Sequence, residues 1–240
     1  MRKLLLPLSY ALSLLAFILW LPAMALVRLV TAPFDPGRKV VGRLFRLWAV
    51  LVVRVCPVWR VRVEGTLPPG PCVVVANHES MLDILVLSLL PREMKWMAKD
   101  SLFRMPWVGW MLRLAGDISV RRGDREGGAR ALKEARAWLT RGVPVMVFPE
   151  GTRSRTAELL PFKPGAFQLA IELGLPVVPV ALAGTARGMP KGGGIWVRPA
   201  TPAVRVLPPL SVQGLNAKDA LRLAAETREL IDAERARLPR

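Results

Sequence analysis

Short apolar runs alternate with amphipathic stretches along most of the chain. From Val61 onward, runs of four to six residues rich in valine are separated by stretches in which apolar residues recur every three to four positions. The runs predict strands, and the stretches predict helices. The predicted strands are Val61–Glu64, Cys72–Ala76, Lys95–Ala98, Asp117–Val120, Val143–Phe148, Val177–Leu182 and Ala203–Leu207. The predicted helices are Met81–Leu90, Phe103–Arg113, Arg125–Arg141, Ala166–Leu173 and a closing helix over Lys218–Leu238. This alternation is typical of an α/β fold.

The amino-terminal segment has a different pattern. Leu4–Val27 carries no charged residue, and a helix of this length covers ~36 Å, enough to cross a hydrocarbon core of ~30 Å. Pro7 and Pro22 argue against one ideal straight helix, and the flanking charges give no clear orientation, so the mode of insertion stays open. The alternative is a cleaved signal peptide, since the apolar run ends in the small-residue sequence Ala23–Ala25.

A basic stripe follows on the next predicted helix, residues 38–56. On a helix that turns about 100° per residue, four basic side chains fall within about 80° of one another; they are Lys39, Arg43, Arg46 and Arg54. We expect an interfacial helix whose basic stripe lies among lipid phosphates. The alternative is the solvated face of an amphipathic helix packed on the domain. The chain thus divides into a membrane-associating two-helix segment (1–56) and an α/β domain (57–240).

Composition supports contact with anions and lipid. The chain has 35 Lys and Arg against 18 Asp and Glu, a formal net charge of +17, which implies nucleic acid, acidic headgroups or phosphorylated substrates as partners. Its hydrophobic content of 52% and mean hydropathy of +0.33 favour lipid. Cys56 and Cys72 lack metal-like spacing and are accompanied by one histidine, which excludes a disulfide framework and makes a zinc site implausible. A reducing compartment is indicated.

The only histidine, His78, directly follows a predicted strand within "ANHESMLD". On a continuous helix His78 and Asp83 would lie about 140° apart. If the strand ends at Ala76 and Ser80 caps the next helix, Asp83 in the first turn can reach back to the imidazole. An imidazole held by a carboxylate is a suitable general base, at a strand end where α/β folds build sites. The alternative is a Ser80-x-x-Asp83 capping box with a solvated histidine.

A second buried run breaks into the polar sequence "FPEGTRS", residues 148–154. Its backbone N–H groups, together with Thr152 and Arg153, form a plausible phosphate cradle at a strand end. Glu150 is placed to accept a hydroxyl hydrogen bond or to hold Arg153, and Gly151 admits close backbone approach. Taken alone, the sequence is equally compatible with a charged turn.

These two blocks, about 70 residues apart, resemble the first and third signature blocks of the glycerophospholipid acyltransferases, especially the 1-acyl-sn-glycerol-3-phosphate acyltransferases. Residues 97–116 resemble the family's lysine-containing strand and Pro-x-x-Gly-Trp segment, and "VVPVAL" resembles its fourth block. The second block, "GDISVRR", departs at Ser119 and Arg121, where an aromatic residue and an acid or amide are usual, so the alignment of Arg122 is less secure. The resemblance covers roughly residues 61–184, and the amino-terminal pair is similar to the family's membrane-docking two-helix motif.

The resemblance implies a single mixed-sheet α/β domain of the glycerolipid-acyltransferase type, preceded by the two-helix membrane motif. It implies transfer of a fatty acyl group from acyl-CoA or acyl-carrier protein to the sn-2 hydroxyl of 1-acyl-sn-glycerol-3-phosphate (lysophosphatidate), giving phosphatidic acid. His78 would take the hydroxyl proton while Asp83 fixes the imidazole tautomer. The candidate phosphate-binding and acceptor-binding residues are Arg153, Arg122, Lys99, Glu150, Gly151 and Thr152. No metal or redox cofactor is implied beyond the thioester co-substrate.

The expected partners are lysophosphatidate, the acyl thioester and an anionic phospholipid membrane at the cytoplasmic face of the cell. An acyl-carrier protein is a further candidate partner. A nucleic-acid binder is disfavoured because no helix-turn-helix, RNA-recognition or zinc signature occurs. A lipid ester hydrolase is disfavoured by the missing G-x-S-x-G elbow, which also counts against Ser80 as an acyl nucleophile. A sister acyltransferase acting on glycerol-3-phosphate or another lysolipid remains open.

Overall fold

The computed structural model describes the backbone of residues 2–154, 158–190 and 197–239, with side chains from residue 17 onward within these ranges. A seven-stranded sheet in the order β1-β7-β6-β2-β5-β3-β4 forms its centre. The strands are β1 (Arg62–Glu64), β2 (Val73–Ala76), β3 (Lys95–Lys99), β4 (Ile118–Val120), β5 (Val145–Val147), β6 (Val177–Ala183) and β7 (Ala203–Val206). Every pairing is parallel except β6 with β7, so the sheet is mixed. All seven predicted strands are present, with bounds that differ by at most two residues.

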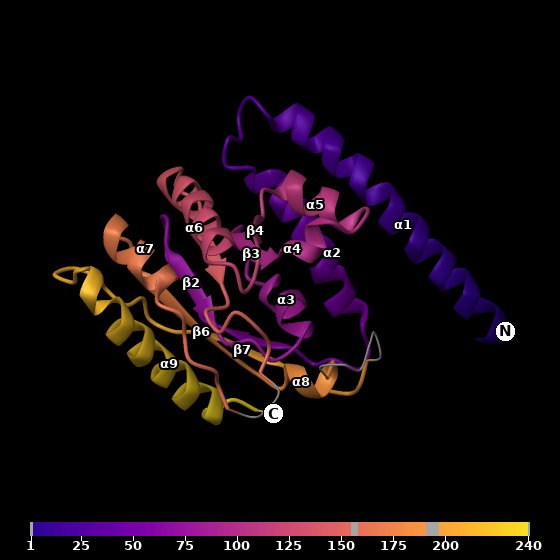
Figure 1. Cartoon of the computed structure of the whole chain (residues 1–240). Coiled ribbons are helices and arrows are strands. Elements are labelled where there is room, and N and C mark those ends of the chain that lie inside the picture. Colours follow the sequence, from indigo (N-terminus) through magenta and orange to yellow (C-terminus); the bar gives the residue numbers. More distant parts are fainter. Residues whose placement is uncertain (1, 155–157, 191–196, 240) are drawn as a thin grey trace.

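Helices cover both faces of this sheet (Figure 1). They are α1 (Arg2–Thr31), α2 (Lys39–Val55), α3 (Leu82–Leu87), α4 (Asp100–Phe103), α5 (Val108–Ala115), α6 (Arg125–Thr140), α7 (Gly165–Leu173), α8 (Thr185–Gly188), the 3₁₀ helix η1 (Ala217–Asp219) and α9 (Ala220–Arg237). Figure 1 shows α6, α7 and α9 on one side of the sheet and α2, α3 and α5 on the other. The architecture is therefore three layers, as the alternation of patterns predicts.

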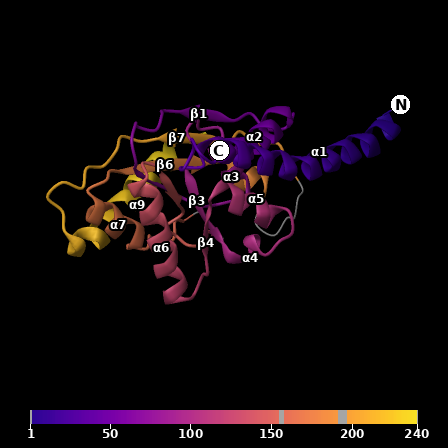
Figure 2. The same ribbon diagram turned by 90° about the horizontal axis from the view of Figure 1, so that it is seen from above.

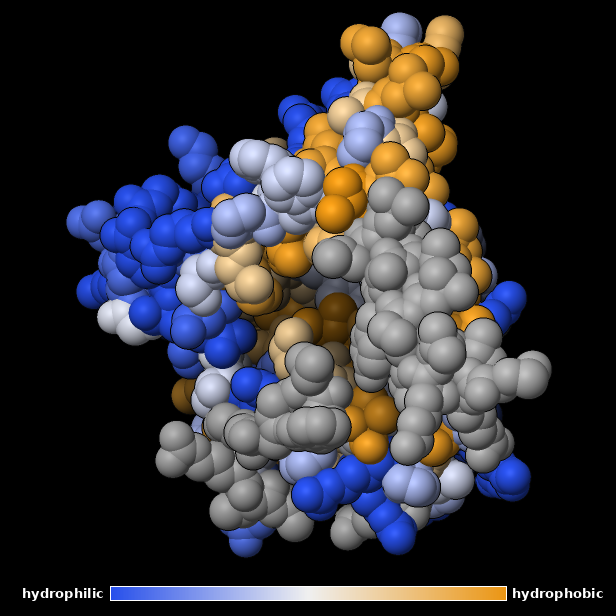
Figure 3. Space-filling view, turned by 90° about the vertical axis from the view of Figure 1, so that its right-hand side faces the viewer, coloured by the Kyte–Doolittle hydropathy of each residue, from blue (hydrophilic) through white to orange (hydrophobic). Residues whose placement is uncertain are grey.

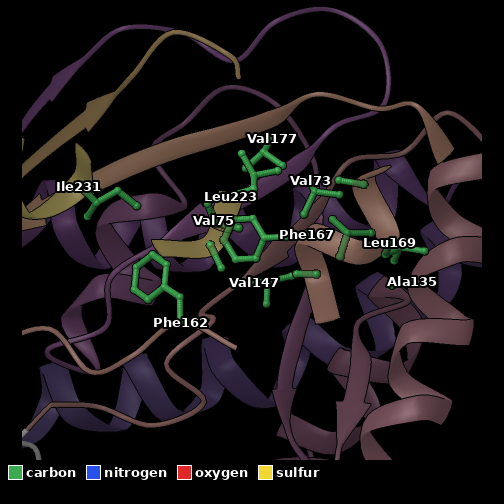
Figure 4. Close-up of a cluster of buried hydrophobic side chains, with 14 of the residues drawn as sticks. Val73, Val75, Ala135, Val147, Phe162, Phe167, Leu169, Val177, Leu223 and Ile231 are labelled. Carbon is green, nitrogen blue, oxygen red and sulfur yellow. The ribbon is translucent and has the colours of Figure 1, made fainter. Parts of the chain in front are cut away.

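Alternate side chains of each strand enter two separate cores. In β2, Val73 and Val75 pack with Phe167 of α7 and other apolar residues beneath α6 and α9, and Figure 4 shows part of this cluster. Val74 and Ala76 instead join the cluster beneath α2 and α3. Burial on both faces explains why the central strands read as continuous apolar runs rather than as an alternation of apolar and polar residues.

The prediction of one continuous helix over Phe103–Arg113 is wrong, because the structure has two shorter helices there, α4 and α5, with a break between them. Pro106 lies in the break, and a proline has no N–H for a helical hydrogen bond. Trp107 next to it adopts a left-handed φ of 60° before α5 begins. The break turns α5 back so that Met111 and Ala115 pack against the amino-terminal helices.

The two amino-terminal helices pack on each other and on α5. Met24 of α1 and Val41 of α2 are fully buried in this contact. No helix in the part of the chain that the structure describes is both long and apolar enough to cross a bilayer. Figure 2 shows the amino-terminal part of α1 extending away from the sheet. Apolar side chains gather over the described part of α1 (Figure 3), and those exposed there and in the following turn are Ile18, Leu19, Leu26, Leu29, Val30 and Phe34.

The predicted basic stripe on α2 needs correction. Lys39 and Arg54 are exposed, but Arg46 is only 5% exposed and pairs with the Asp117 carboxylate. Its guanidinium also lies over the Trp96 ring, 4.9 Å from the centroid. Arg43 is half-buried and donates to the main-chain oxygens of the α3 carboxyl end. The basic side of α2 therefore faces the domain in part, because buried carboxylate and carbonyl oxygens of the domain attract these arginines.

Candidate active site

The predicted site residues converge at one edge of the sheet. Because β2, β3, β4 and β5 are parallel, their carboxyl ends meet there, and such edges are where α/β folds bind ligands. His78 follows β2, the 150–153 loop follows β5, and Arg122 follows β4. Lys99 ends β3 and is exposed at the same edge. Segments far apart in the sequence thus contribute to one region.

His78 and Asp83 form a buried pair. The imidazole Nδ1 lies 2.7 Å from Asp83 Oδ2, with the two side chains 7% and 0% exposed. The chain reverses direction through residues 77–81, here called the histidine turn, and α3 then begins at Leu82, so Asp83 reaches back as the sequence predicts. A carboxylate at Nδ1 selects the tautomer with hydrogen on Nδ1, which leaves Nε2 as an acceptor. This is the arrangement that a general base requires.

The Asp83 carboxylate also organises the histidine turn. Its Oδ2 accepts hydrogen bonds from the backbone N–H groups of Glu79 at 2.7 Å and Ser80 at 2.8 Å. The Ser80 hydroxyl accepts from the Leu82 N–H at 3.1 Å and donates to the Met189 carbonyl at 2.6 Å. Ser80 therefore supports the start of α3, but the capping-box alternative is wrong as posed, because the Ser80 hydroxyl accepts from Leu82 rather than from Asp83 and His78 is buried rather than solvated.

Glu150 ties the second block to the first. One carboxylate oxygen accepts from the His78 backbone N–H at 2.8 Å, and the other accepts from the Leu160 N–H at 2.9 Å. Burial raises the pKa of Glu150, and these two backbone hydrogen bonds partly offset that effect. Phe148 of the same block stacks on the His78 ring, with centroids 4.0 Å apart. Glu150 thus holds the histidine backbone in place, rather than Arg153 as one sequence interpretation had it.

A cavity of about 190 Å³ has Phe148, the residue that stacks on the His78 ring, in its wall, but His78 itself does not line it. Its lining includes Arg122, Gly151 and Lys163. Gly151 has a φ of +71°, and a Cβ there would lie 2.9 Å from the Lys163 ammonium nitrogen, so any side chain would displace the lysine. Burial lowers the pKa of Arg122, and the nearby positive charge of Arg153 lowers it further. The cavity therefore gathers positive charge suited to an anion.

Sequence reasoning missed two basic residues of this region. Lys163 precedes α7, and its backbone N–H donates to the Pro149 carbonyl at 3.0 Å, but no pattern in the sequence distinguishes it from a surface lysine. Arg235 lies near the end of α9 and reaches the histidine turn through Glu79. Lys99 and Thr152 are exposed and do not line the cavity, so their predicted roles stay predictions.

Comparison with known proteins places this geometry in a family. A family model described as Acyltransferase matches residues 60–183. A 1-acyl-sn-glycerol-3-phosphate acyltransferase of Chlamydomonas reinhardtii is 38% identical over 82% of this chain and 60% of its own length. The corresponding alpha enzyme of Mus musculus is 38% identical over 70% of this chain and 61% of its own length. The chain thus spans about three fifths of the length of these relatives.

A solved structure matches nearly the whole chain. The crystal structure of the 1-acyl-sn-glycerophosphate acyltransferase PlsC from Thermotoga maritima superposes with a TM-score of 0.70 at 26% sequence identity. The match covers 93% of this chain and 95% of that one, and so includes the amino-terminal helices as well as the sheet. With the family model covering more than half of the residues, the chain belongs to the acyltransferase family.

Proposed function

We propose that the protein transfers a fatty acyl group from a thioester to the sn-2 hydroxyl of 1-acyl-sn-glycerol-3-phosphate, giving phosphatidic acid. The observation that carries this proposal is the buried His78–Asp83 pair beside a cavity lined by positive charge. The pair supplies a base for a hydroxyl, and the cavity supplies cations for a phosphate. The relatives named 1-acyl-sn-glycerol-3-phosphate acyltransferases support this choice of substrate.

The geometry supports direct transfer. His78 Nε2 accepts the hydroxyl proton as the alcohol oxygen attacks the thioester carbonyl, and Asp83 stabilises the imidazolium that forms. The carbon–sulfur bond then breaks, and the thiolate leaves with the proton that the imidazolium returns. General-base assistance of this kind contributes ~10²–10⁴ in rate. The donor is acyl-CoA or an acylated carrier protein.

An acyl-enzyme on Ser80 is disfavoured by the contacts of its hydroxyl. The oxygen donates to Met189 and accepts from Leu82, so its proton points away from His78. A serine nucleophile requires its hydroxyl proton to face the base. Trapping with labelled acyl donor should therefore leave no acyl group on the protein.

Phosphate recognition falls to the cations around the cavity. Arg122 lines the cavity, and the charge of Arg153 lowers the pKa of Arg122, so the two guanidinium groups act on one another electrostatically, although Arg153 itself does not line the cavity. Lys163 adds an ammonium group on the same wall as Gly151. A phosphomonoester between these groups would relieve their mutual repulsion.

The proposal is tested with purified protein, lysophosphatidate and other lysolipids, and both donor types, with products resolved by mass. Phosphatidic acid should form, and His78→Gln should remove turnover. Arg153→Ala should raise the KM for lysophosphatidate about tenfold or more while the KM for the donor changes less than twofold. The control is Arg222→Ala on α9, which removes the same charge outside the site. Equal effects on both KM values would contradict the phosphate role.

We also propose that α1 and the α1–α2 turn contact an anionic membrane at the cytoplasmic face. Leu29 is 74% exposed and Phe34 82% exposed, and exposed apolar groups near the exposed cation Lys39 at the start of α2 fit a lipid interface. Leu29→Ser should weaken sedimentation with anionic vesicles about tenfold. Leu221→Ser, at a leucine of α9 that is 66% exposed, should not. Indistinguishable vesicle binding by the two variants would refute the contact.

A further inference from the structure

The last helix of the chain reaches the histidine turn through one buried arginine. Arg235 of α9 donates from Nη1 to Glu79 Oε1 at 2.9 Å, across 156 residues of sequence. Its Nη2 is held by Asp232 Oδ1 at 2.6 Å, one turn earlier in α9. The side chains of Arg235 and Glu79 are 9% and 15% exposed, so solvent screens this ion pair little.

Glu79 links this contact to the base. It directly follows His78, and its backbone N–H donates to the same Asp83 oxygen that holds the imidazole. The Glu79 side chain also accepts from Asn77 Nδ2 at 3.4 Å. A displacement of the Glu79 side chain therefore moves the Glu79 backbone N–H, which donates to the Asp83 carboxylate. Because the same carboxylate holds the His78 ring, the ring moves as well.

The charge around the histidine gives Arg235 a second effect. The ring and backbone of His78 meet the carboxylates of Asp83 from α3 and Glu150 from the loop after β5, while Glu79 stands next to it in the turn. Arg235 approaches from α9 and neutralises Glu79. Without that cation, the Glu79 carboxylate would favour the protonated imidazole, which cannot accept a proton.

We propose that Arg235 is a positioning residue for the acyl transfer, acting through Glu79 to hold the histidine turn and to offset the negative charge of Glu79 next to His78. This inference rests on the proposed function for its rate measurements but not for its structural ones. It makes α9 part of the active-site assembly rather than a closing helix that only covers the sheet.

The kinetic test compares Arg235→Gln with Arg237→Gln, an exposed arginine of the same helix. Arg235→Gln should lower kcat about tenfold with the KM for lysophosphatidate within twofold, and should move the acid limb of the pH–rate profile to higher pH. Arg235→Lys should restore part of kcat, and Arg237→Gln should match the wild type. A KM effect alone, or a loss of kcat with an unmoved pH profile, would overturn the proposal.

Double mutants test whether Glu79 is the intermediary. In a Glu79→Gln background, where no charge needs neutralising, Arg235→Gln should change kcat less than threefold. An undiminished tenfold loss in that background would show that Arg235 acts by another route. If Arg235→Gln fails to fold, Arg235→Lys takes its place. The loss of kcat that Arg235→Lys causes should then be smaller in the Glu79→Gln background than in the wild type.

The single histidine provides a readout that needs no substrate. Because His78 is the only imidazole in 240 residues, a ¹⁵N-histidine label gives one titrating ring. Arg235→Gln should shift its titration midpoint to higher pH, and Arg237→Gln should leave it in place. An unchanged titration midpoint would contradict the positioning role of Arg235. A shifted midpoint in a protein that makes no phosphatidic acid would instead mean that the proposed function, not this inference, is wrong.

Discussion

Asp83→Asn tests the central pair of the site with little change of shape. Asp83 Oδ2 accepts three donors, the His78 ring and the backbone N–H groups of Glu79 and Ser80. Its other oxygen is buried and has no hydrogen-bond partner among the described residues. An asparagine can keep its oxygen at the first position and place its amide nitrogen at the second. The tautomer of His78 is then preserved, and the negative charge alone is lost.

The size of the effect follows from that loss. A hydrogen bond to a charged group contributes about 1.5–3 kcal/mol, roughly twice a neutral one. Because asparagine keeps a neutral hydrogen bond to the ring, about half of that energy, roughly 0.75–1.5 kcal/mol, is lost, and kcat should fall about 4- to 13-fold. Asp83→Ala also releases the histidine turn, so it should approach the full ~10²–10⁴ of general-base assistance. The graded order of these two variants is specific to the geometry.

Steady-state kinetics with lysophosphatidate measure both variants, and Asp219→Asn at the start of α9 controls for the loss of one carboxylate. Thermal unfolding of each variant shows whether the fold is kept. In a His78→Gln background, Asp83→Asn should cause no further loss, because the two residues act as one unit. A kcat of Asp83→Asn within twofold of the wild type, or an equal loss in the absence of the imidazole, would refute the reasoning.

Two further predictions concern stability. Arg46→Ala leaves Asp117 charged and buried, so the free energy of unfolding should fall by about 3–5 kcal/mol; urea denaturation should show no comparable loss for the exposed Lys39→Ala, and equal losses would contradict the buried pair. Burial raises the pKa of Glu150 above 4.5, so the folded chain holds this proton more tightly than the unfolded chain. The stabilisation is therefore complete below pH 4.5 and is lost as pH rises through the raised pKa. Unfolding curves across that range should show a smaller decline for Glu150→Gln, and parallel declines would argue against it.

The strands and the position of the site could be predicted from the sequence. Strands such as β2 are buried on both faces, which produces apolar runs that end at polar residues. Parallel pairing then brings those polar ends together, so the sequence alone assigns His78, Glu150 and Arg122 to one edge of the sheet. The turn between His78 and Asp83 could also be predicted, because the end of a strand and the start of a helix leave the chain few ways to connect them.

Partners distant in sequence could not be predicted. A helical wheel shows that Arg46 is on the basic side of α2, but it does not show that this side faces the buried carboxylate of Asp117. The same holds for Arg235, which resembles the other arginines of the amphipathic helix α9 and differs only in facing Glu79. The periodicity of apolar residues in a helix shows which of its faces is polar. Whether that face contacts water, lipid or a buried carboxylate depends on how the helix packs against the rest of the chain.

The Arg46–Asp117 pair also bears on how the amino-terminal helices relate to the chemistry. Asp117 immediately precedes β4, and Arg122 lies two residues beyond its end, so one short strand joins the residue that pairs with Arg46 of α2 to the cavity that Arg122 lines. The strand between them pairs with β3 and has little freedom, and Arg122 lies in the turn that follows it. Under the proposed membrane contact, the hairpin of α1 and α2 is therefore not a flexible tether. Its orientation on the lipid fixes the orientation of the cavity, so a charge at Arg122 is held at a set depth relative to the headgroups from which a lipid acceptor must come.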